Sequence, residues 1–376
     1  MEGKIYYKDI YEKILKDIVD GVYPPNAMLP FENELSAQYD VSITTIRHAL
    51  KLLEDDHYII KVKGKGSFVN PEIDTSSYND DINCFGVLFF ENRKAIVRDD
   101  YYHYSNLWSA KIYNSIFMKI KDEYTLIFDS MYEDEVVEKF KTHNTVLDNV
   151  KRILIISYSG MSPEILTYLE SQGKQLIMYN YFNYAYKICN VLTNDREVYN
   201  ILVRKLFKLN HERIAMINGA VEGPYRDSIE RFMGYQEAFI TKGRTLNEKL
   251  VKWSVSPRDA YYKMLEIFDL PKEEWPTAVV CVNDGVAIGV YEAIKEKGLR
   301  IPEDISVIGH DNDKIAAKMD PPLTSIDPMY DDIAKAIVSY FKRKIWTKRD
   351  RIVVKGKLIM RNSVLDYAQE KKKDEE

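Results

Sequence analysis

Polar and basic side chains cluster on one face of a helix that is predicted to begin at Ser42. The opposite face is an apolar stripe at helical spacing, which can pack on neighbouring elements: Ile46, Ala49, Leu50 and Leu53. The polar face has no acid before residue 54 and consists of Thr44, Thr45, Arg47, His48 and Lys51. Hydrogen-bonding side chains in the first turns of a helix suit a position in the major groove of duplex DNA. Ser42 is also a favourable N-cap, and its hydroxyl could anchor a phosphate together with the free N–H groups of Thr44 and Thr45.

A basic turn follows this predicted recognition helix. Residues 59–63 alternate apolar and basic side chains, as a half-exposed strand does. Gly64 and Gly66 then allow a tight turn between Lys63 and Lys65, because glycine adopts backbone conformations that other residues avoid. We expect this cationic tip to lie against phosphates or a minor groove.

Together these features predict a winged helix-turn-helix domain in residues 1–70, since a short helix at residues 32–39 and a corner at Asp40 precede the recognition helix. The alternative is a small helical bundle with a hairpin that binds no DNA. Acids outnumber Lys plus Arg in this region, which favours the alternative, but phosphate binding requires a local basic stripe rather than net charge. That stripe is present: Arg47, Lys51, Lys61, Lys63 and Lys65.

Three separated blocks of this region resemble, in the same order, the GntR family of bacterial transcription factors. The blocks are Leu29-Pro30 with Glu32-Asn33-Glu34-Leu35-Ser36-Ala37, then Val41-Ser42-Ile43-Thr44-Thr45-Ile46-Arg47-His48-Ala49-Leu50, then Gly64-Lys65-Gly66-Ser67-Phe68-Val69. Phe31 stands where the family usually has a capping Ser, and Ile43 where it usually has an Arg that contacts DNA. These departures bear on the operator sequence more than on the fold. The candidate contacts to double-stranded DNA are Ser42, Thr44, Thr45, Arg47, His48, Lys51, Lys63, Lys65 and Gly66.

The chain of 376 residues is long enough for two or three hydrophobic cores. Its net charge of −5 restricts any contact with nucleic acid to a local surface. The N-terminus lacks the apolar run of a signal peptide, and no apolar span of about 18 residues occurs, so we expect a cytoplasmic protein with no membrane partner. Cys84, Cys189 and Cys281 are far apart and lie beside apolar residues, which predicts buried thiols rather than a metal knuckle or a disulfide framework.

The sequence contains none of the common catalytic motifs that we sought. A phosphate-binding Gly-x-x-x-x-Gly-Lys-Ser frame, a Gly-x-Ser-x-Gly elbow and a His-Glu-x-x-His pair are absent. Residues 310–313 are rich in acids but lack the glycine and the distal Glu of a calcium loop. We therefore expect a binding protein rather than an enzyme, with no cofactor and no metal site.

The rest of the chain divides by composition. Residues 71–83 are polar and acidic, which predicts a linker, and residues 368–376 form a charged tail. Residues 84–367 alternate β-rich runs with helical stretches, which predicts an α/β domain of two lobes with parallel sheets and a cleft between them. The predicted strands are 85–90, 125–128, 153–157, 176–179, 214–217, 278–282 and 305–308. Ligands of such sheets bind at the carboxyl ends of the strands.

Polar residues gather at four of these strand ends, where we find Tyr158, Asn180, Asn283 and Asp311. Asn and Asp at a strand-to-helix turn are also common helix caps, and each residue taken singly is explained as well by a cap as by a ligand contact. The convergence of four such ends favours a binding site, to which Tyr330 is added as a candidate. Trp108 is a candidate stacking surface for a sugar face, although a packing role explains it equally well.

The second half of the chain resembles the effector domains of LacI-type regulators and periplasmic sugar-binding proteins. The resemblance rests on residues 209–215, 231–235 and 281–289, and most strongly on residues 301–312 and 321–326. It implies that Arg231, Asn283 and Asp311 hold the effector. The chemistry of these groups suits the vicinal hydroxyls of a sugar, because Arg donates, Asp accepts and Asn does both.

A GntR-type domain joined to a LacI-type effector domain implies a repressor of carbohydrate-utilisation genes that a small sugar such as L-arabinose releases from its operator. A homodimer formed through the effector domains would place two recognition helices on the half-sites of a palindrome. The acidic segment after Pro71 replaces the hinge helix of LacI proteins, so we expect no hinge in the minor groove. The alternatives are a cytoplasmic sugar-binding protein and a regulator that senses a non-pentose ligand.

Overall fold

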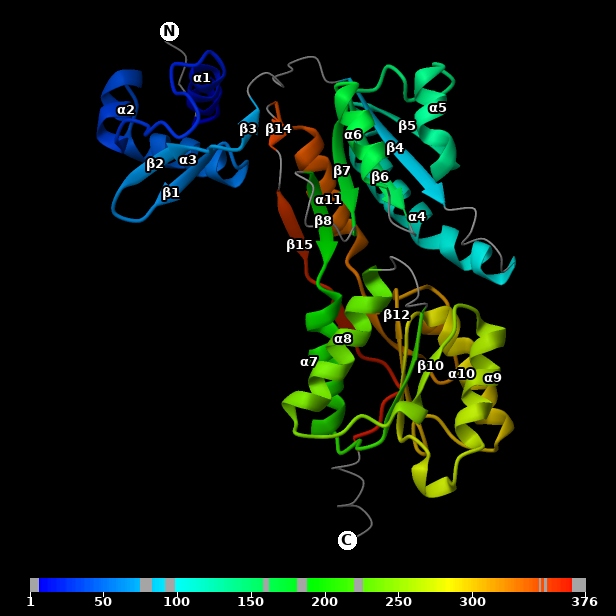
Figure 1. Cartoon of the computed structure of the whole chain (residues 1–376). Coiled ribbons are helices and arrows are strands. Elements are labelled where there is room, and N and C mark those ends of the chain that lie inside the picture. Colours follow the sequence, from blue (N-terminus) through cyan, green and yellow to red (C-terminus); the bar gives the residue numbers. More distant parts are fainter. Residues whose placement is uncertain are drawn as a thin grey trace.

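The computed structural model describes residues 7–74, 83–91, 99–157, 162–180, 188–219, 226–344, 346–347 and 350–366, and for residues 74, 90–91, 99–108 and 346–347 it describes only the backbone. A small N-terminal domain of three helices and a hairpin precedes two α/β lobes (Figure 1). Among the described residues, no helix is both long enough and apolar enough to cross a membrane.

The N-terminal domain is a winged helix-turn-helix, as predicted. Its elements are α1 (Tyr7–Val19), α2 (Glu32–Tyr39), α3 (Ile43–Asp55), β1 (Ile59–Val62) and β2 (Gly66–Val69). Asp40 ends α2 in the left-handed conformation, with φ of 51°, and so turns the chain sharply into α3. The apolar stripe of α3 is buried, and it packs with Ile10, Ile14 and Leu35 into one core.

The first lobe is a six-stranded parallel sheet with helices on both faces. Its strand order is β15-β8-β7-β6-β4-β5. The strands are β4 (Cys84–Glu91), β5 (Thr125–Tyr132), β6 (Arg152–Ser157), β7 (Gln175–Tyr179), β8 (Cys189–Thr193) and β15 (Arg351–Val354). One face packs on α4 (Asp99–Ile120) and α11 (Tyr330–Phe341), and the other on α5 (Val136–Lys141) and α6 (Pro163–Ser171).

The second lobe repeats this plan. Its strand order is β10-β9-β11-β12-β13-β16, and all pairs are parallel except β13 with β16. The strands are β9 (Ile214–Asn218), β10 (Val251–Trp253), β11 (Ala278–Cys281), β12 (Ser306–His310), β13 (Thr324–Asp327) and β16 (Lys357–Ile359). Helices α7 (Asp195–Lys208) and α8 (Arg226–Thr241) cover one face, and α9 (Pro257–Phe268) and α10 (Asp284–Glu296) the other. The prediction of parallel sheets is confirmed in both lobes, and the short β16 adds one antiparallel strand at the edge of the second.

The described chain passes between the lobes at three places, from β8 into α7, from β13 into α11 and from β15 into β16. The carboxyl ends of strands from the two lobes meet there, since Asn180 after β7 accepts a hydrogen bond from Arg226 of α8. The two-lobed prediction is therefore confirmed. Several strands escaped prediction, because β10 and β16 are only three residues long and β8 contains a polar Asn190.

The predicted linker begins with ordered structure. Residues Ile73–Asp74 form β3, which pairs antiparallel with β14 (Trp346–Thr347), a strand that follows α11 in the first lobe. The start of the segment is thus paired with a strand of the first lobe. The sequence did not predict this pairing, because the segment has no apolar periodicity. Residues 75–82 and the predicted charged tail lie outside the described residues. The predicted burial of the thiols is confirmed for Cys189 and Cys281, whereas Cys84 is half-buried.

Candidate functional site

Helix α3 presents the polar face that the sequence predicts. Thr44, Arg47, His48 and Lys51 are exposed, and Thr45 is half-buried. Lys51 is paired on its own helix, with Nζ 2.8 Å from the Asp55 carboxylate, and the His48 ring meets the edge of Tyr7 at 5.8 Å between centroids. These side chains of α3 are therefore open to solvent on one face of the helix.

Ser42 caps α3 as predicted, but its hydroxyl occupies one of the N–H groups that were expected to bind a phosphate. Its Oγ accepts a hydrogen bond from the N–H of Thr45 at 3.1 Å and lies 2.8 Å from Thr45 Oγ1. The expectation of a free N–H at Thr45 is therefore wrong, and a phosphate at that N–H would have to displace the Ser42 hydroxyl. The cap expected to be missing at Phe31 is partly replaced, because its N–H donates to Glu34 Oε2 at 2.7 Å.

Glu32 connects the recognition helix with the wing. Its Oε2 lies 2.6 Å from Arg47 Nε, and its Oε1 lies 3.7 Å from Lys61 Nζ. The pair with Arg47 is exposed to solvent and contributes little stability, but it restrains the guanidinium next to the first turn of α3. Lys63 and Lys65 are exposed on either side of the turn that contains Gly64, whose φ is 77°. The role of Glu32 depends on the angle between α2 and α3, so no sequence signal could have found it.

A cavity of about 610 Å³ lies at the junction of the two lobes. Its lining residues are Lys111, Asp311, Asn312, Asp313, Lys314, Ile315, Asp327, Met329, Tyr330 and Asp331. The first lobe contributes Lys111 from α4, the second lobe contributes the loop after β12, and Met329 and Tyr330 lie where the chain crosses between them. The fold thus brings together two predicted ligand residues, Asp311 and Tyr330, in one cavity wall.

Asp311 is held as an ionised acceptor in this wall. The Tyr330 hydroxyl donates to its Oδ1 at 3.1 Å, and His310 Nδ1 lies 3.2 Å from the same oxygen. Burial opposes ionisation, but the hydrogen bond and charge of His310, with the charge of Arg231, outweigh it and lower the pKa of Asp311 to about 2. At neutral pH the carboxylate is therefore charged and can accept hydrogen bonds from ligand hydroxyls.

Arg231 lies behind the cavity rather than among its lining residues. Its Nη1 donates to the carbonyl of Val282 at 2.8 Å, and its Nε lies 3.4 Å from Asp195 Oδ1. Asp195 Oδ1 is also 3.4 Å from His310 Nε2, so a buried polar network runs from Arg231 through Asp195 and His310 to Asp311. Asp195 escaped prediction because it follows β8, a strand that the apolar pattern did not indicate.

Asn283 and Asn180 are both engaged by other residues of the chain. Asn283 Oδ1 accepts from the N–H of Val286 at 2.8 Å and so caps α10. Asn180 Oδ1 accepts from Arg226 Nη1 at 2.6 Å and from Thr193 Oγ1 at 3.0 Å. Neither is among the residues that line the junction cavity. The sequence left open whether Asn283 is a helix cap or a ligand contact, and its hydrogen bond shows that it is a cap.

Two predicted ligand residues cannot be placed in the same way. Tyr158 lies outside the described residues. Trp108 belongs to α4, but its side chain lies outside the described part of the structure. Their roles stay predictions.

Asp284 supports the loop after β12 from behind. Its Oδ1 accepts from Ser325 Oγ at 2.6 Å, and its Oδ2 accepts from the N–H of Asp313 at 2.7 Å. Burial raises the pKa of Asp284 to about 7. Gly309 is required beside it, because a Cβ at that position would lie 2.1 Å from Asp284 Oδ1. This packing fixes the backbone that carries Asp311 and Asp313.

An ion pair bridges the two lobes at the cavity. Lys111 of α4 donates to the carboxylate of Asp313 in the second lobe. Lys111 Nζ also lies 5.3 Å from the centroid of the Tyr330 ring. A single lysine on a helix carries no sequence signal for such a role, since its partner lies more than 200 positions away.

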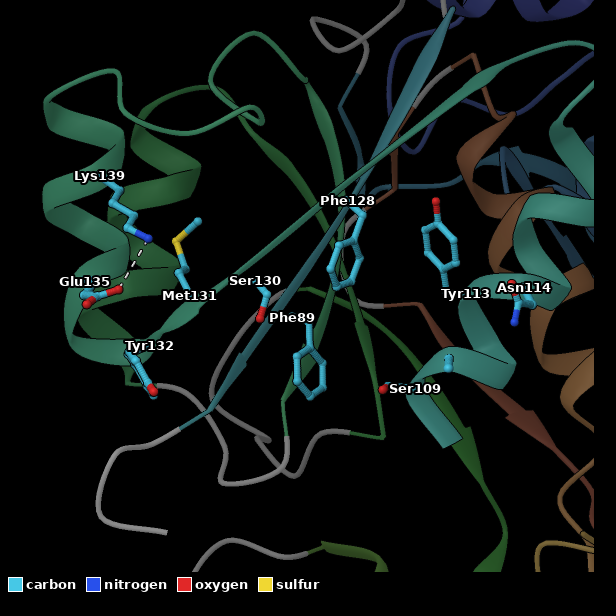
Figure 2. Close-up of a pocket in the computed structure, with 11 residues that line it drawn as sticks. Phe89, Ser109, Tyr113, Asn114, Phe128, Ser130, Met131, Tyr132, Glu135 and Lys139 are labelled. Atoms are coloured by element: carbon cyan, nitrogen blue, oxygen red, sulfur yellow. Dashed lines mark ion pairs between the residues drawn. The ribbon is translucent and has the colours of Figure 1, made fainter. Parts of the chain in front are cut away.

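A second cavity of about 690 Å³ lies within the first lobe (Figure 2). Its lining residues are Phe89, Ser109, Ala110, Tyr113, Asn114, Phe128, Ser130, Met131, Tyr132, Glu135 and Lys139. Figure 2 shows Lys139 directed at Glu135, 3.4 Å away, while Tyr113 and Phe128 lie on the opposite side of the cavity. This cavity is the larger of the two, yet it contains no predicted ligand residue and lies within one lobe. The junction cavity therefore suits a ligand that acts on the arrangement of the lobes.

A winged helix-turn-helix followed by two α/β lobes with a cavity at their junction is typical of ligand-responsive DNA-binding regulators. Two family models match the chain accordingly. The model of bacterial regulatory proteins of the gntR family matches residues 6–69, and that of the periplasmic binding protein-like domain matches residues 203–364.

Curated relatives extend over the whole chain. The arabinose metabolism transcriptional repressor of Geobacillus stearothermophilus is 25% identical over an alignment of 376 positions, gaps included, that covers 95% of this chain and 97% of the relative. The repressor of the same description from Halalkalibacterium halodurans is 25% identical over an alignment of 399 positions, gaps included, that covers 99% of both chains. The probable transcriptional repressor ExuR of Bacillus subtilis is 30% identical over 217 residues, or 56% of this chain and 64% of its own.

Solved structures share the fold of the lobes. A LacI-family regulatory protein from Chloroflexus aggregans superposes with a TM-score of 0.61 at 19% identity, over 74% of this chain and 98% of its own. A LacI regulator from Bacillus cereus gives a TM-score of 0.62 at 19% identity, over 76% and 99%. The chain thus joins a domain that matches the gntR-family model to a domain that matches the periplasmic binding protein-like model, the same two-part organisation over which it aligns with the arabinose metabolism transcriptional repressors.

Proposed function

We propose that this protein is a repressor of sugar-utilisation genes that acts in the cytoplasm and leaves a palindromic operator when an arabinose-like polyol binds the junction cavity. The observation that carries the proposal is the ionised Asp311, hydrogen-bonded by Tyr330, in a cavity walled by both lobes. The relatives that align over the full chain are arabinose metabolism repressors, and they support the pentose as the first ligand to test.

The lining of the cavity favours a neutral, hydroxylated ligand over an anionic one. Its charged side chains are four Asp and two Lys, so the wall has an excess of acceptors and of negative charge. Sugar hydroxyls can donate to the carboxylates of Asp311 and Asp327 and accept from Lys111 and Asn312. A ligand carboxylate or phosphate would meet repulsion from the excess of acids.

Helix α11 offers a route from the cavity to the DNA-binding domain. It begins at Tyr330 in the cavity wall, and the chain after it forms β14, which pairs with β3 directly behind the helix-turn-helix domain (Figure 1). Lys344 Nζ, beyond the end of α11, lies 2.8 Å from Glu12 Oε2 of α1. Closure of the lobes around a ligand would move α11 and so change the orientation of α3. A coupling of about 1 to 3 kcal/mol would change operator affinity about 5-fold to 150-fold.

The operator is proposed to be bound by a homodimer. Strand β5 is an edge strand of the first lobe, and apolar side chains are exposed on it and on the neighbouring α4. They are Phe117, Met118, Phe128 and Tyr132. Apolar side chains gathered on one face commonly mark an interface. A homodimer that reads a palindrome needs its two α3 helices about 34 Å apart, which is the spacing of successive half-sites.

The decisive experiment combines ligand binding with operator release. A duplex bound by the full-length protein is selected from a random pool, and thermal shift and gel-shift titration are then carried out with L-arabinose, its enantiomer D-arabinose, D-xylose, D-glucose, D-galacturonate and glucose 6-phosphate. We expect L-arabinose to raise the melting temperature, because it binds only the folded protein, and to weaken operator binding. D-arabinose is the matched control. A protein that binds its duplex but responds to none of these ligands would contradict the proposal.

A further inference from the structure

Ile43 is an exposed hydrocarbon at the start of the recognition helix. It is the first residue of α3, directly after the Ser42 cap, and 41% of its surface is exposed. Its neighbours Thr44 and Arg47 are also exposed, so Ile43 borders the polar face of the helix. Single exposed apolar side chains are common on protein surfaces. Ile43 is distinguished by its place, because it directly follows the helix cap and borders the polar face, so a partner that docks on this face would meet it.

The partner of this face is a DNA major groove under the proposed function, and the first turn of a recognition helix is the part that reaches base edges. An isoleucine side chain neither donates nor accepts hydrogen bonds. It therefore cannot read the acceptors of guanine, the amino group of cytosine or the paired groups of adenine. The 5-methyl group of thymine is the one apolar feature that bases present in the major groove.

We propose that Ile43 reads the 5-methyl group of one thymine in each operator half-site, and so determines a T·A pair at that position. The inference rests on the proposed docking of α3 in the major groove. Contact would remove one methyl group and part of the Ile43 side chain from water. Burial of a group of this size corresponds to about a fourfold change in affinity for each half-site.

Deoxyuridine provides a direct test, because it pairs as thymidine does and lacks only the 5-methyl group. Each thymine of the selected duplex is replaced in turn by deoxyuridine, and binding by the full-length protein is measured by gel-shift titration. For the wild type we expect one position in each half-site where the replacement weakens binding about threefold to fivefold. Ile43→Ala should bind more weakly and be insensitive to the replacement there, whereas Ile43→Val should keep the sensitivity, because it retains a branched apolar side chain.

The outcomes separate this inference from the proposal beneath it. If no replacement affects the wild type, or if Ile43→Ala shows the same sensitivity as the wild type, Ile43 does not read a methyl group. The docking of α3 is tested separately, by measuring the affinity of Arg47→Ala for the same duplexes. Loss of affinity in Arg47→Ala with no coupling between Ile43 and a methyl group would overturn only the inference. If operator affinity were unchanged in both Arg47→Ala and Ile43→Ala, or if no duplex could be selected, the docking of α3 would be overturned as well.

Discussion

Arg231 and Asp195 form a buried ion pair beside the first crossing between the lobes. Arg231 Nε lies 3.4 Å from Asp195 Oδ1, and the two side chains are 9% and 3% exposed. Burial alone would raise the pKa of Asp195, but the charge of Arg231 and hydrogen bonds from His310 and Thr193 hold it well below its usual range. The same carboxylate, together with Asp311, keeps the pKa of His310 above its usual value, although burial and the charge of Arg231 oppose this.

Replacement of Asp195 by Asn should strongly destabilise the protein. The change preserves shape but removes the buried carboxylate that Arg231 and His310 share, which leaves Asp227 and Asp311 as their nearest anions. The loss of one partner of a buried pair costs about 3 to 5 kcal/mol. The free energy of unfolding, measured in urea, tests this. The matched control is Asp227→Asn, since that carboxylate lies 3.8 Å from Arg231 but is 42% exposed, and it should cost less than about 1 kcal/mol. Equal stabilities of the two variants would contradict the assignment.

Replacement of Asp311 by Asn should abolish most ligand binding and spare operator binding. Loss of a charged acceptor for ligand hydroxyls costs about 1.5 to 3 kcal/mol, which is about a 10-fold to 150-fold rise in Kd. Isothermal titration with the sugar identified by thermal shift measures the effect. Asp320→Asn is a suitable control, because its side chain is 98% exposed and lies outside the cavity lining. An unchanged Kd in Asp311→Asn would remove this residue from the proposed site.

Replacement of Arg47 by Ala should weaken operator binding without affecting the ligand. The guanidinium projects from the exposed face of α3, and loss of a base contact costs about 1 to 3 kcal/mol. Gel-shift titration at several salt concentrations also reveals its type of contact, because a lost phosphate contact lowers the salt slope by about one. Arg244→Ala, an exposed arginine of the second lobe paired with Glu212, should leave operator affinity unchanged. An undiminished affinity in Arg47→Ala would refute the docking of α3.

The pKa of Asp284 predicts a distinct dependence of stability on pH. The folded protein holds this proton up to about pH 7, whereas the unfolded chain releases it near pH 4. Because the folded state binds more protons in this window, stability falls as pH rises from about 4 to about 7. The contribution of Asp284 is fully present below pH 4 and is lost as pH passes through its folded pKa. Asp311 acts in the opposite direction, but at lower pH, because its folded pKa is about 2.

Asp284→Asn isolates this term, since it removes the titrating group and leaves His310 and Asp311 in place. As pH rises from about 4 to about 7, the unfolding free energy of the variant should increase relative to that of the wild type by up to about 1.4 kcal/mol per pH unit. The dependence of this difference on pH is informative even though the variant loses a carboxylate acceptor and is less stable than the wild type. Parallel curves for the two proteins between pH 4.5 and 7 would show that Asp284 does not titrate in this range.

Local spacing in the sequence determined the DNA-binding domain. The apolar residues of α3 recur every three or four positions, and the helical repeat alone places them on one side and Thr44, Arg47 and Lys51 on the other. Ser42, Asp40 and Gly64 mark the cap, the corner and the turn through their own backbone preferences. These properties need no distant partner, which is why they could be predicted.

The ligand site depended on the tertiary structure. Asp195 and Arg231 are separated by 36 positions, and Lys111 and Asp313 by 202. No periodicity in a segment of chain specifies such pairs, because they arise only when the chain crosses between two lobes whose sheets face each other. Likewise Asn283 could equally well be a cap or a ligand contact by its position after a strand. The hydrogen bond from the N–H of Val286 shows that it is a cap, and its contact with a ligand stays a prediction. The apolar pattern of the sequence located the strand ends and so the polar residues that follow them, whereas tertiary packing determined which of these residues contact one another.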